Sequence, residues 1–276
     1  MSTYLFIDGG YLRSKFAAYT KRYYNLESLP DLAGLYEAMS GQHGPTRHDI
    51  EKIFYYDCVP ESNPAASPSS SHSTTVRIDE QYVSEIRAKP RWHVREGRLV
   101  GERARGLRQK RVDILLTVEM LSHAFAKNMS RAILIAGDDD FTPLVNELLR
   151  HGIFVELWSD PLAPAQHLAD SADEFRPMRI WFYWRLMPPE ERTKHPFPDF
   201  HGTTLLPPDD LVVRCGVSRS GLPIMICKTS DLYHFVSQQD LTKRSHARCA
   251  DRYVLETLIA DEFQNHELTP KRWEDV

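Results

Sequence analysis

The chain has 276 residues, of which 42% are hydrophobic and 26% are charged, and its formal net charge is −4. This composition is ordinary for a soluble globular protein, and the length suits one large domain or a domain with a smaller companion. The net charge argues against a uniformly basic nucleic-acid coat but is compatible with a local basic patch.

The cysteines and the apolar segments indicate the compartment. None of the four cysteines forms a CxxC pair, so neither a zinc knuckle nor a redox motif is indicated. Scattered thiols in a chain of this length favour a reducing compartment. The N-terminal MSTYLFIDGG lacks the basic region of a signal peptide, and no apolar run approaches the roughly 20 residues of a membrane span. We therefore expect a cytoplasmic protein that binds no membrane.

Short apolar runs alternate with helical patterns in the first part of the chain. The runs predict buried strands at residues 4–8, 52–57, 132–137 and 154–158. Helices are predicted over 112–127 and 141–152. In the first of these helices the apolar residues recur at helical spacing: Ile114, Val118, Leu121 and Phe125. Apolar strands that alternate with helices predict an α/β fold with a parallel sheet covered by helices on both faces.

Two compositional breaks divide the chain. Residues 60–75 are rich in Pro and Ser and predict a flexible insertion, and prolines recur through 187–210. We place a domain boundary near residue 185, which gives a first domain over 1–185 and an accessory region over 186–276.

The accessory region is predicted to be a small α+β extension of unknown role. Residues 211–217 and 224–228, joined by a Gly-containing turn, predict a β-hairpin. Residues 246–264 predict an amphipathic helix, and Arg244, Arg248 and Arg252 recur at helical spacing in the accessory region. The apolar side of that helix is formed by Tyr253, Leu255, Leu258, Ile259 and Phe263.

Acidic side chains follow three strand-to-helix junctions of the α/β pattern. Asp8 ends the first strand, Asp113 opens a helix, and Asp138, Asp139 and Asp140 follow the third strand. The carboxyl ends of parallel strands share one edge of the sheet, where open α/β sheets bind their ligands. Carboxylates that converge there repel one another unless a cation neutralises them. Hard oxygen ligands suit Mg²⁺ or Mn²⁺, so the pattern predicts a divalent metal site for phosphoryl chemistry.

Each acid alone also has a local role open to it. Asp8 precedes Gly9 and Gly10 and could be a turn residue, and Asp113 could be a helix N-cap. One of the three consecutive acids could cap the following helix and interact with its dipole. The metal-site interpretation therefore rests on the coincidence of acids at three junctions.

Three motifs carry a resemblance to a known family. The stretches FIDGG at 6–10, KRVDILLTVEML at 110–121 and AGDDDFTPLV at 136–145 resemble, in this order, the acidic motifs of the NYN domain family, within the PIN-like nuclease superfamily. LADSADEF at 168–175 resembles the stretch that closes such domains. The resemblance implies a Rossmann-like, PIN-type parallel sheet flanked by helices, and a ribonuclease that depends on Mg²⁺ or Mn²⁺.

The resemblance also implies catalytic and metal-binding roles. Asp8, Asp113 and Asp138 would be the central ligands, with Asp140 in support. Asp139 and Thr117 are further candidates for a supporting role.

Two positions depart from the family pattern. Tyr11 stands where many members carry Asn, and Glu119 stands where many carry Asp. Glu119 keeps the charge and is a further supporting candidate, and it lies about 120° round the helix from Asp113.

A basic run leads into the second acidic motif. Between residues 87 and 111, Arg and Lys are opposed only by Glu96 and Glu102. The run could guide RNA phosphates to the metal, or it could be a solvated hairpin. The residues predicted to bind nucleic acid are Arg103, Arg105, Arg108, Lys110 and Arg111, together with Trp92 as a base-stacking ring.

The sequence as a whole predicts a metal-dependent ribonuclease. Single-stranded or structured RNA is the expected partner, DNA is the other candidate substrate, and a homo-oligomer is compatible with the sequence. A haloacid-dehalogenase-like phosphatase would need a second Asp at position 10, which is Gly10. A non-catalytic RNA-binding or regulatory module with the same fold is the remaining alternative.

Overall fold

The computed structural model describes residues 2–40, 49–58, 80–100, 108–110, 112–161, 165–197, 211–239, 242–262 and 268–275. The chain divides into two compact units, Met1–Pro189 and Glu190–Val276, and each is described by itself. The predicted insertion at 60–75 lies outside the described residues.

The first unit is built on a mixed sheet. Its strands lie in the order β4-β3-β2-β1-β5-β6-β7. All neighbours pair in parallel except β3 and β4, which are antiparallel. The strands are β1 (Thr3–Asp8), β2 (Ile50–Cys58), β3 (Trp92–Val100), β4 (Arg108–Lys110), β5 (Arg131–Ile135), β6 (Phe154–Ser159) and β7 (Glu174–Pro177). The predicted parallel α/β sheet is confirmed.

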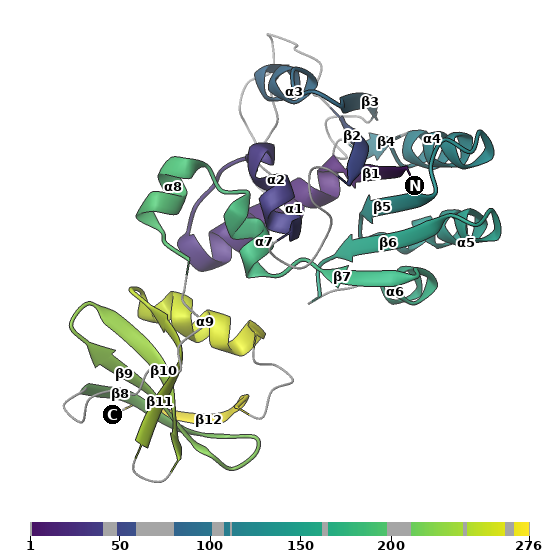
Figure 1. Ribbon diagram of the computed structural model, residues 1–276. Coiled ribbons are helices and arrows are strands. Elements are labelled where there is room, and N and C mark those ends of the chain that lie inside the picture. Colours follow the sequence, from purple (N-terminus) through teal and green to yellow (C-terminus); the bar gives the residue numbers. More distant parts are fainter. Residues whose placement is uncertain are drawn as a thin grey trace. The chain divides into compact units, whose positions relative to one another are not determined.

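Helices cover both faces of this sheet, as Figure 1 shows. One layer holds α4 (Val112–Phe125), α5 (Thr142–Arg150) and α6 (Gln166–Ser171). The other holds α1 (Gly9–Tyr24), α2 (Leu35–Ser40) and α7 (Ile180–Arg185). Shorter elements of this unit are the 3-10 helices η1 (Leu32–Gly34) and η2 (Asp139–Phe141), with α3 (Glu80–Arg87) beside β3. The helix α8 (Pro189–Lys194) begins at the last residue of this unit and otherwise belongs to the second.

Burial on both faces explains the continuous apolar strands. Residues 3–7 of β1 are all buried. Tyr4 and Phe6 belong to the core under α4, α5 and α6, and the alternation of a strand turns Leu5 and Ile7 to the opposite layer. There α1 and α7 meet through the stacked rings of Tyr19 and Tyr183, whose centroids are 4.1 Å apart.

The buried face of α4 is not the face that the predicted apolar stripe indicated. Its buried residues are Val112, Leu116, Met120 and Ala124. Three residues of the predicted apolar stripe are exposed: Ile114 at 65%, Val118 at 56% and Phe125 at 55%. Both sides of this helix carry apolar residues, so spacing alone does not tell which side meets the sheet.

The strand β7 was not predicted, and β3 and β4 were anticipated only by the hairpin that was the alternative interpretation of the basic run. β3 has the sequence WHVREGRLV, in which charged residues interrupt any apolar run. β3 and β4 form an antiparallel pair, so the basic run of 87–111 includes a hairpin. β7 lies at the opposite edge of the sheet and is only partly buried.

The second unit holds an antiparallel sheet in the order β11-β10-β9-β8-β12. Its elements are β8 (Leu211–Ser218), β9 (Pro223–Thr229), β10 (Leu232–Gln239), β11 (Thr242–Cys249), α9 (Arg252–Glu262) and β12 (Pro270–Asp275). The predicted hairpin is confirmed by β8 and β9, and Gly221 in their turn has a φ of 85°, which favours glycine.

The predicted helix over 246–264 was wrong in its first part. Arg244 and Arg248 lie on the strand β11, so they do not line a helix with Arg252. Tyr253 is 65% exposed, whereas Leu255, Leu258 and Ile259 are buried as expected, and Phe263 lies outside the described residues. In the described parts of both units, no helix is long and apolar enough to span a membrane.

Candidate active site

The acidic residues lie where adjacent parallel strands end. β1 ends at Asp8, and its parallel neighbour β5 ends shortly before Asp138. Asp113 lies in the first turn of α4, which packs against β1 and β2. Parallel strands place their carboxyl ends at one edge, so the motifs from distant parts of the chain meet there. We call Asp8, Asp113, Asp138 and Asp140 the carboxylate rim.

The pKa shifts show that the members of the carboxylate rim interact. Burial raises the pKa of Asp113, and the charges of Asp138 and Asp140 raise it further. The pKa of Asp8 is raised to about 7, mainly by burial and to a smaller extent by the Asp113 carboxylate. Asp8 is partly exposed and the other three are exposed, so an ionic ligand can reach the rim.

Two rim residues also cap helices. Asp8 is the N-cap of α1, where its Oδ1 accepts a hydrogen bond from the Tyr11 backbone N–H at 2.9 Å. Asp138 is the N-cap of η2, where its Oδ1 accepts from the Asp140 N–H at 3.0 Å. No hydrogen bond from a described residue occupies either Oδ2. The caps therefore orient both carboxylates and leave one oxygen of each for a ligand.

Both carboxylate oxygens of Asp139 contact residues of α6 and not the carboxylate rim. Its Oδ1 accepts a hydrogen bond from the Leu168 N–H at 3.1 Å, and its Oδ2 lies 3.3 Å from Nδ1 of His167. These contacts, the Leu168 bond foremost, lower the pKa of Asp139. The carboxylate connects η2 to α6, which accounts for the middle acid of the run without a metal.

Tyr11, which stands where the family commonly has Asn, fills the space between strand ends. Its hydroxyl lies 2.8 Å from Oγ of Ser159 and accepts a hydrogen bond from the Asp160 N–H at 2.9 Å. Burial raises the pKa of Tyr11 to about 12, so the ring stays neutral. A β-carbon at Gly137 would overlap this ring, which explains the glycine between β5 and Asp138.

A fifth carboxylate at the strand ends is already neutralised. Asp57, near the end of β2, is 1% exposed and accepts two hydrogen bonds from the Arg13 guanidinium, each at 2.7 Å. The Tyr55 hydroxyl donates a third at 3.0 Å. Because its charge is matched, Asp57 is not available as a ligand. The Arg13–Asp57 pair was not predicted; the Asp that ends the second apolar run was its only sequence signal.

The two other supporting candidates lie on α4. Glu119 pairs with Arg95 at distances of 2.6 and 2.8 Å and accepts a hydrogen bond from the Tyr56 hydroxyl at 2.8 Å. These contacts connect α4 to the sheet and agree with its position away from Asp113. Thr117 is partly buried on the same helix.

The structure describes only part of the basic run. Arg103, Arg105 and Arg111 lie outside the described residues, and the side chains of Arg108 and Lys110 are not described. Trp92 is 7% exposed at the start of β3, so its ring packs inside the protein and is not free to stack on a base. Arg87 pairs with Glu96.

The residues of the rim fit a hard cation by their chemistry, since they supply carboxylate oxygens and the pKa values of Asp8 and Asp113 are raised in part by neighbouring rim carboxylates. Their side chains do not form a closed coordination sphere. In the described ranges, no three His, Cys, Asp or Glu side chains are arranged so that they could hold a metal ion.

Comparison with known proteins identifies the class. Residues 2–179 match the NYN domain, so the chain belongs to the NYN family, which is part of the PIN-like nuclease superfamily. Membership points to a nuclease-like domain. No curated protein matches the chain.

A solved structure is also similar to the chain. It is that of a protein of unknown function from Vibrio parahaemolyticus RIMD 2210633, at 18% sequence identity and a TM-score of 0.45. The similarity covers 64% of this chain and 93% of that chain.

Proposed function

We propose that the first unit is a metal-dependent ribonuclease that hydrolyses RNA phosphodiester bonds at the carboxylate rim. The observation that carries the proposal is the electrostatic coupling of four aspartates, of which Asp8 ends β1, Asp138 and Asp140 follow its parallel neighbour β5, and Asp113 lies in the first turn of α4. Membership of the NYN family supports nuclease chemistry, and RNA is the substrate that the resemblance favours.

The rim residues would hold Mg²⁺ or Mn²⁺. The cap hydrogen bonds orient the carboxylates of Asp8 and Asp138 and leave the Oδ2 of each for the cation. Asp113 and Asp140 would add negative charge beside it. The cation would supply positive charge to the scissile phosphate and lower the pKa of a water molecule. No side-chain nucleophile is needed. The basic residues of 103–111 are proposed to guide the RNA to the rim.

The test is a cleavage assay with single-stranded RNA, structured RNA and DNA in the presence and absence of Mn²⁺. We expect cleavage of RNA that requires Mn²⁺. Asp138→Asn should lower the rate by at least about 100-fold, because Asn keeps the cap on η2 but removes a charged ligand.

Asp139→Asn is the matched control, since it changes the neighbouring carboxylate, which contacts α6. This variant should cleave at nearly the wild-type rate. RNA binding without any cleavage would favour the non-catalytic module, and preferential cleavage of DNA would overturn the substrate assignment. Equal losses in both variants would contradict the separate roles of Asp138 and Asp139.

A further inference from the structure

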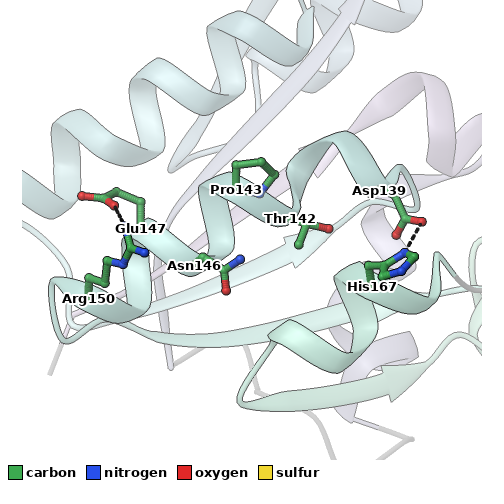
Figure 2. Close-up of a pocket in the computed structure, with 7 residues that line it drawn as sticks. All are labelled: Asp139, Thr142, Pro143, Asn146, Glu147, Arg150 and His167. Carbon is green, nitrogen blue, oxygen red and sulfur yellow. Dashed lines mark hydrogen bonds and ion pairs between the residues drawn. The ribbon is translucent and has the colours of Figure 1, made fainter.

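A groove beside the carboxylate rim has no role in the function proposed so far. It lies along α5 and the start of α6 and has a volume of about 620 Å³. Figure 2 shows Thr142, Asn146 and Arg150 on α5, with Asp139 and His167 at the other end of the groove.

Both acidic and basic side chains line this groove. Glu147 pairs with Arg150 at 3.1 Å, and Asp139 lies 3.3 Å from the ring of His167. No surplus positive charge remains among these lining residues to hold a phosphate. The lining therefore suits a ligand that is polar but uncharged.

Among the described residues, one polar side chain of the groove has no hydrogen-bond partner. The exposed side chain of Asn146 makes no hydrogen bond with any described residue. Because the Asn146 amide is exposed on the lining, both its donor and its acceptor are available to a ligand in the groove.

The groove also offers ring and apolar surface. The side chain of His167 is 83% exposed, and Pro143 lines the same groove. Exposed bases of single-stranded RNA stack on rings such as histidine and form hydrogen bonds along their edges. An asparagine amide matches the paired donor and acceptor of adenine.

We propose that this groove binds a nucleobase of the RNA strand, beside the scissile phosphate, and prefers adenine. The proposal rests on the proposed function, because the groove starts at Asp139, between the rim residues Asp138 and Asp140. A strand that crosses the rim would place the neighbouring nucleotide in the groove, with Asn146 on the base edge and His167 against its face.

The test separates base recognition from cleavage. Binding of short labelled oligoadenylate and oligouridylate is measured by fluorescence anisotropy with the Asp138→Asn protein and with the same protein carrying Asn146→Ala. The matched control carries Asn128→Ala, which replaces another exposed asparagine, just after the end of α4. Cleavage by the wild-type protein is measured in parallel.

We expect tighter binding of oligoadenylate, and we expect Asn146→Ala to reduce this preference by about tenfold while Asn128→Ala leaves it unchanged. An adenine preference that survives Asn146→Ala overturns the inference even if the wild type cleaves RNA. An adenine preference that Asn146→Ala removes supports it even if no cleavage occurs, in which case the proposed function fails alone. Absence of any RNA binding overturns both.

Discussion

Asp8 shows at the residue scale how one side chain serves the local fold and the candidate site together. Its Oδ1 caps α1, and its burial at the end of β1 raises its pKa to about 7. Asp57 is the same residue type and also lies near the end of a strand, but the Arg13 guanidinium neutralises its charge. The partner of an acid at the strand ends, not its residue type, therefore decides whether its carboxylate stays available to a ligand.

The raised pKa of Asp8 predicts how stability depends on pH. In the unfolded chain an Asp has a pKa of about 3.9, so between about pH 4 and pH 7 the folded protein retains a proton that the unfolded chain has released. The free energy of unfolding should therefore fall as pH rises through this interval in metal-free buffer. Asp8→Asn keeps an N-cap but cannot ionise, so its stability should fall less.

Urea denaturation of both proteins at several pH values measures this difference. Asp113 titrates in both proteins, so the informative quantity is the gap between the two curves. Curves that run parallel from pH 4 to pH 7 would contradict an elevated Asp8 pKa.

At the scale of elements, α4 carries the second acidic motif and packs on the sheet through Val112, Leu116, Met120 and Ala124. Its other side exposes Ile114 and Val118. Burial, not apolar character, decides how much each residue contributes to stability, because exposed apolar atoms lose no contact with water on folding.

Substitutions on the two sides of α4 should therefore differ strongly. Leu116→Ala should cost about 2–5 kcal/mol of unfolding free energy, since Leu116 is fully buried. Val118→Ala should change stability by no more than about 0.5 kcal/mol. Chemical denaturation of the two variants gives both values, and comparable costs would show that the exposed side of α4 is covered in solution.

At the scale of the whole molecule, the family match covers residues 2–179, and the two compact units divide at Pro189 and Glu190. The carboxylate rim lies within the first unit, and the protein as a whole has a net charge of −4. An acidic site in an acidic protein repels a polyanion, so approach of RNA requires local positive charge from a cation or from basic residues.

Divalent metal should accordingly stabilise the first unit. A ligand that binds only the folded state adds about 2.7 kcal/mol when present at a hundred times its Kd. We expect Mn²⁺ to raise the Tm of the wild-type protein and of Asp139→Asn, but much less that of Asp113→Asn. Differential scanning calorimetry at increasing Mn²⁺ concentrations provides the measurement, and an equal rise in all three proteins would place the metal elsewhere.

Local patterns in the sequence determined the parallel α/β layer. The apolar runs at 4–8, 52–57, 132–137 and 154–158 correspond to β1, β2, β5 and β6, because a strand buried on both faces must be apolar along its length. The position of the acids at strand-to-helix junctions also predicted which carboxylates lie together at the carboxylate rim. Their metal-binding role stays a prediction.

Tertiary structure alone decided which acids are free and which helix face is buried. Arg13 and Asp57 are 44 residues apart, and Tyr11 and Ser159 are 148 residues apart, so no local spacing reports these contacts. Periodicity likewise predicted α4 but not its buried side, since both sides carry apolar residues. A sequence pattern reports the neighbours of a residue along one element, whereas charge neutralisation and burial depend on neighbours that only folding brings within contact distance.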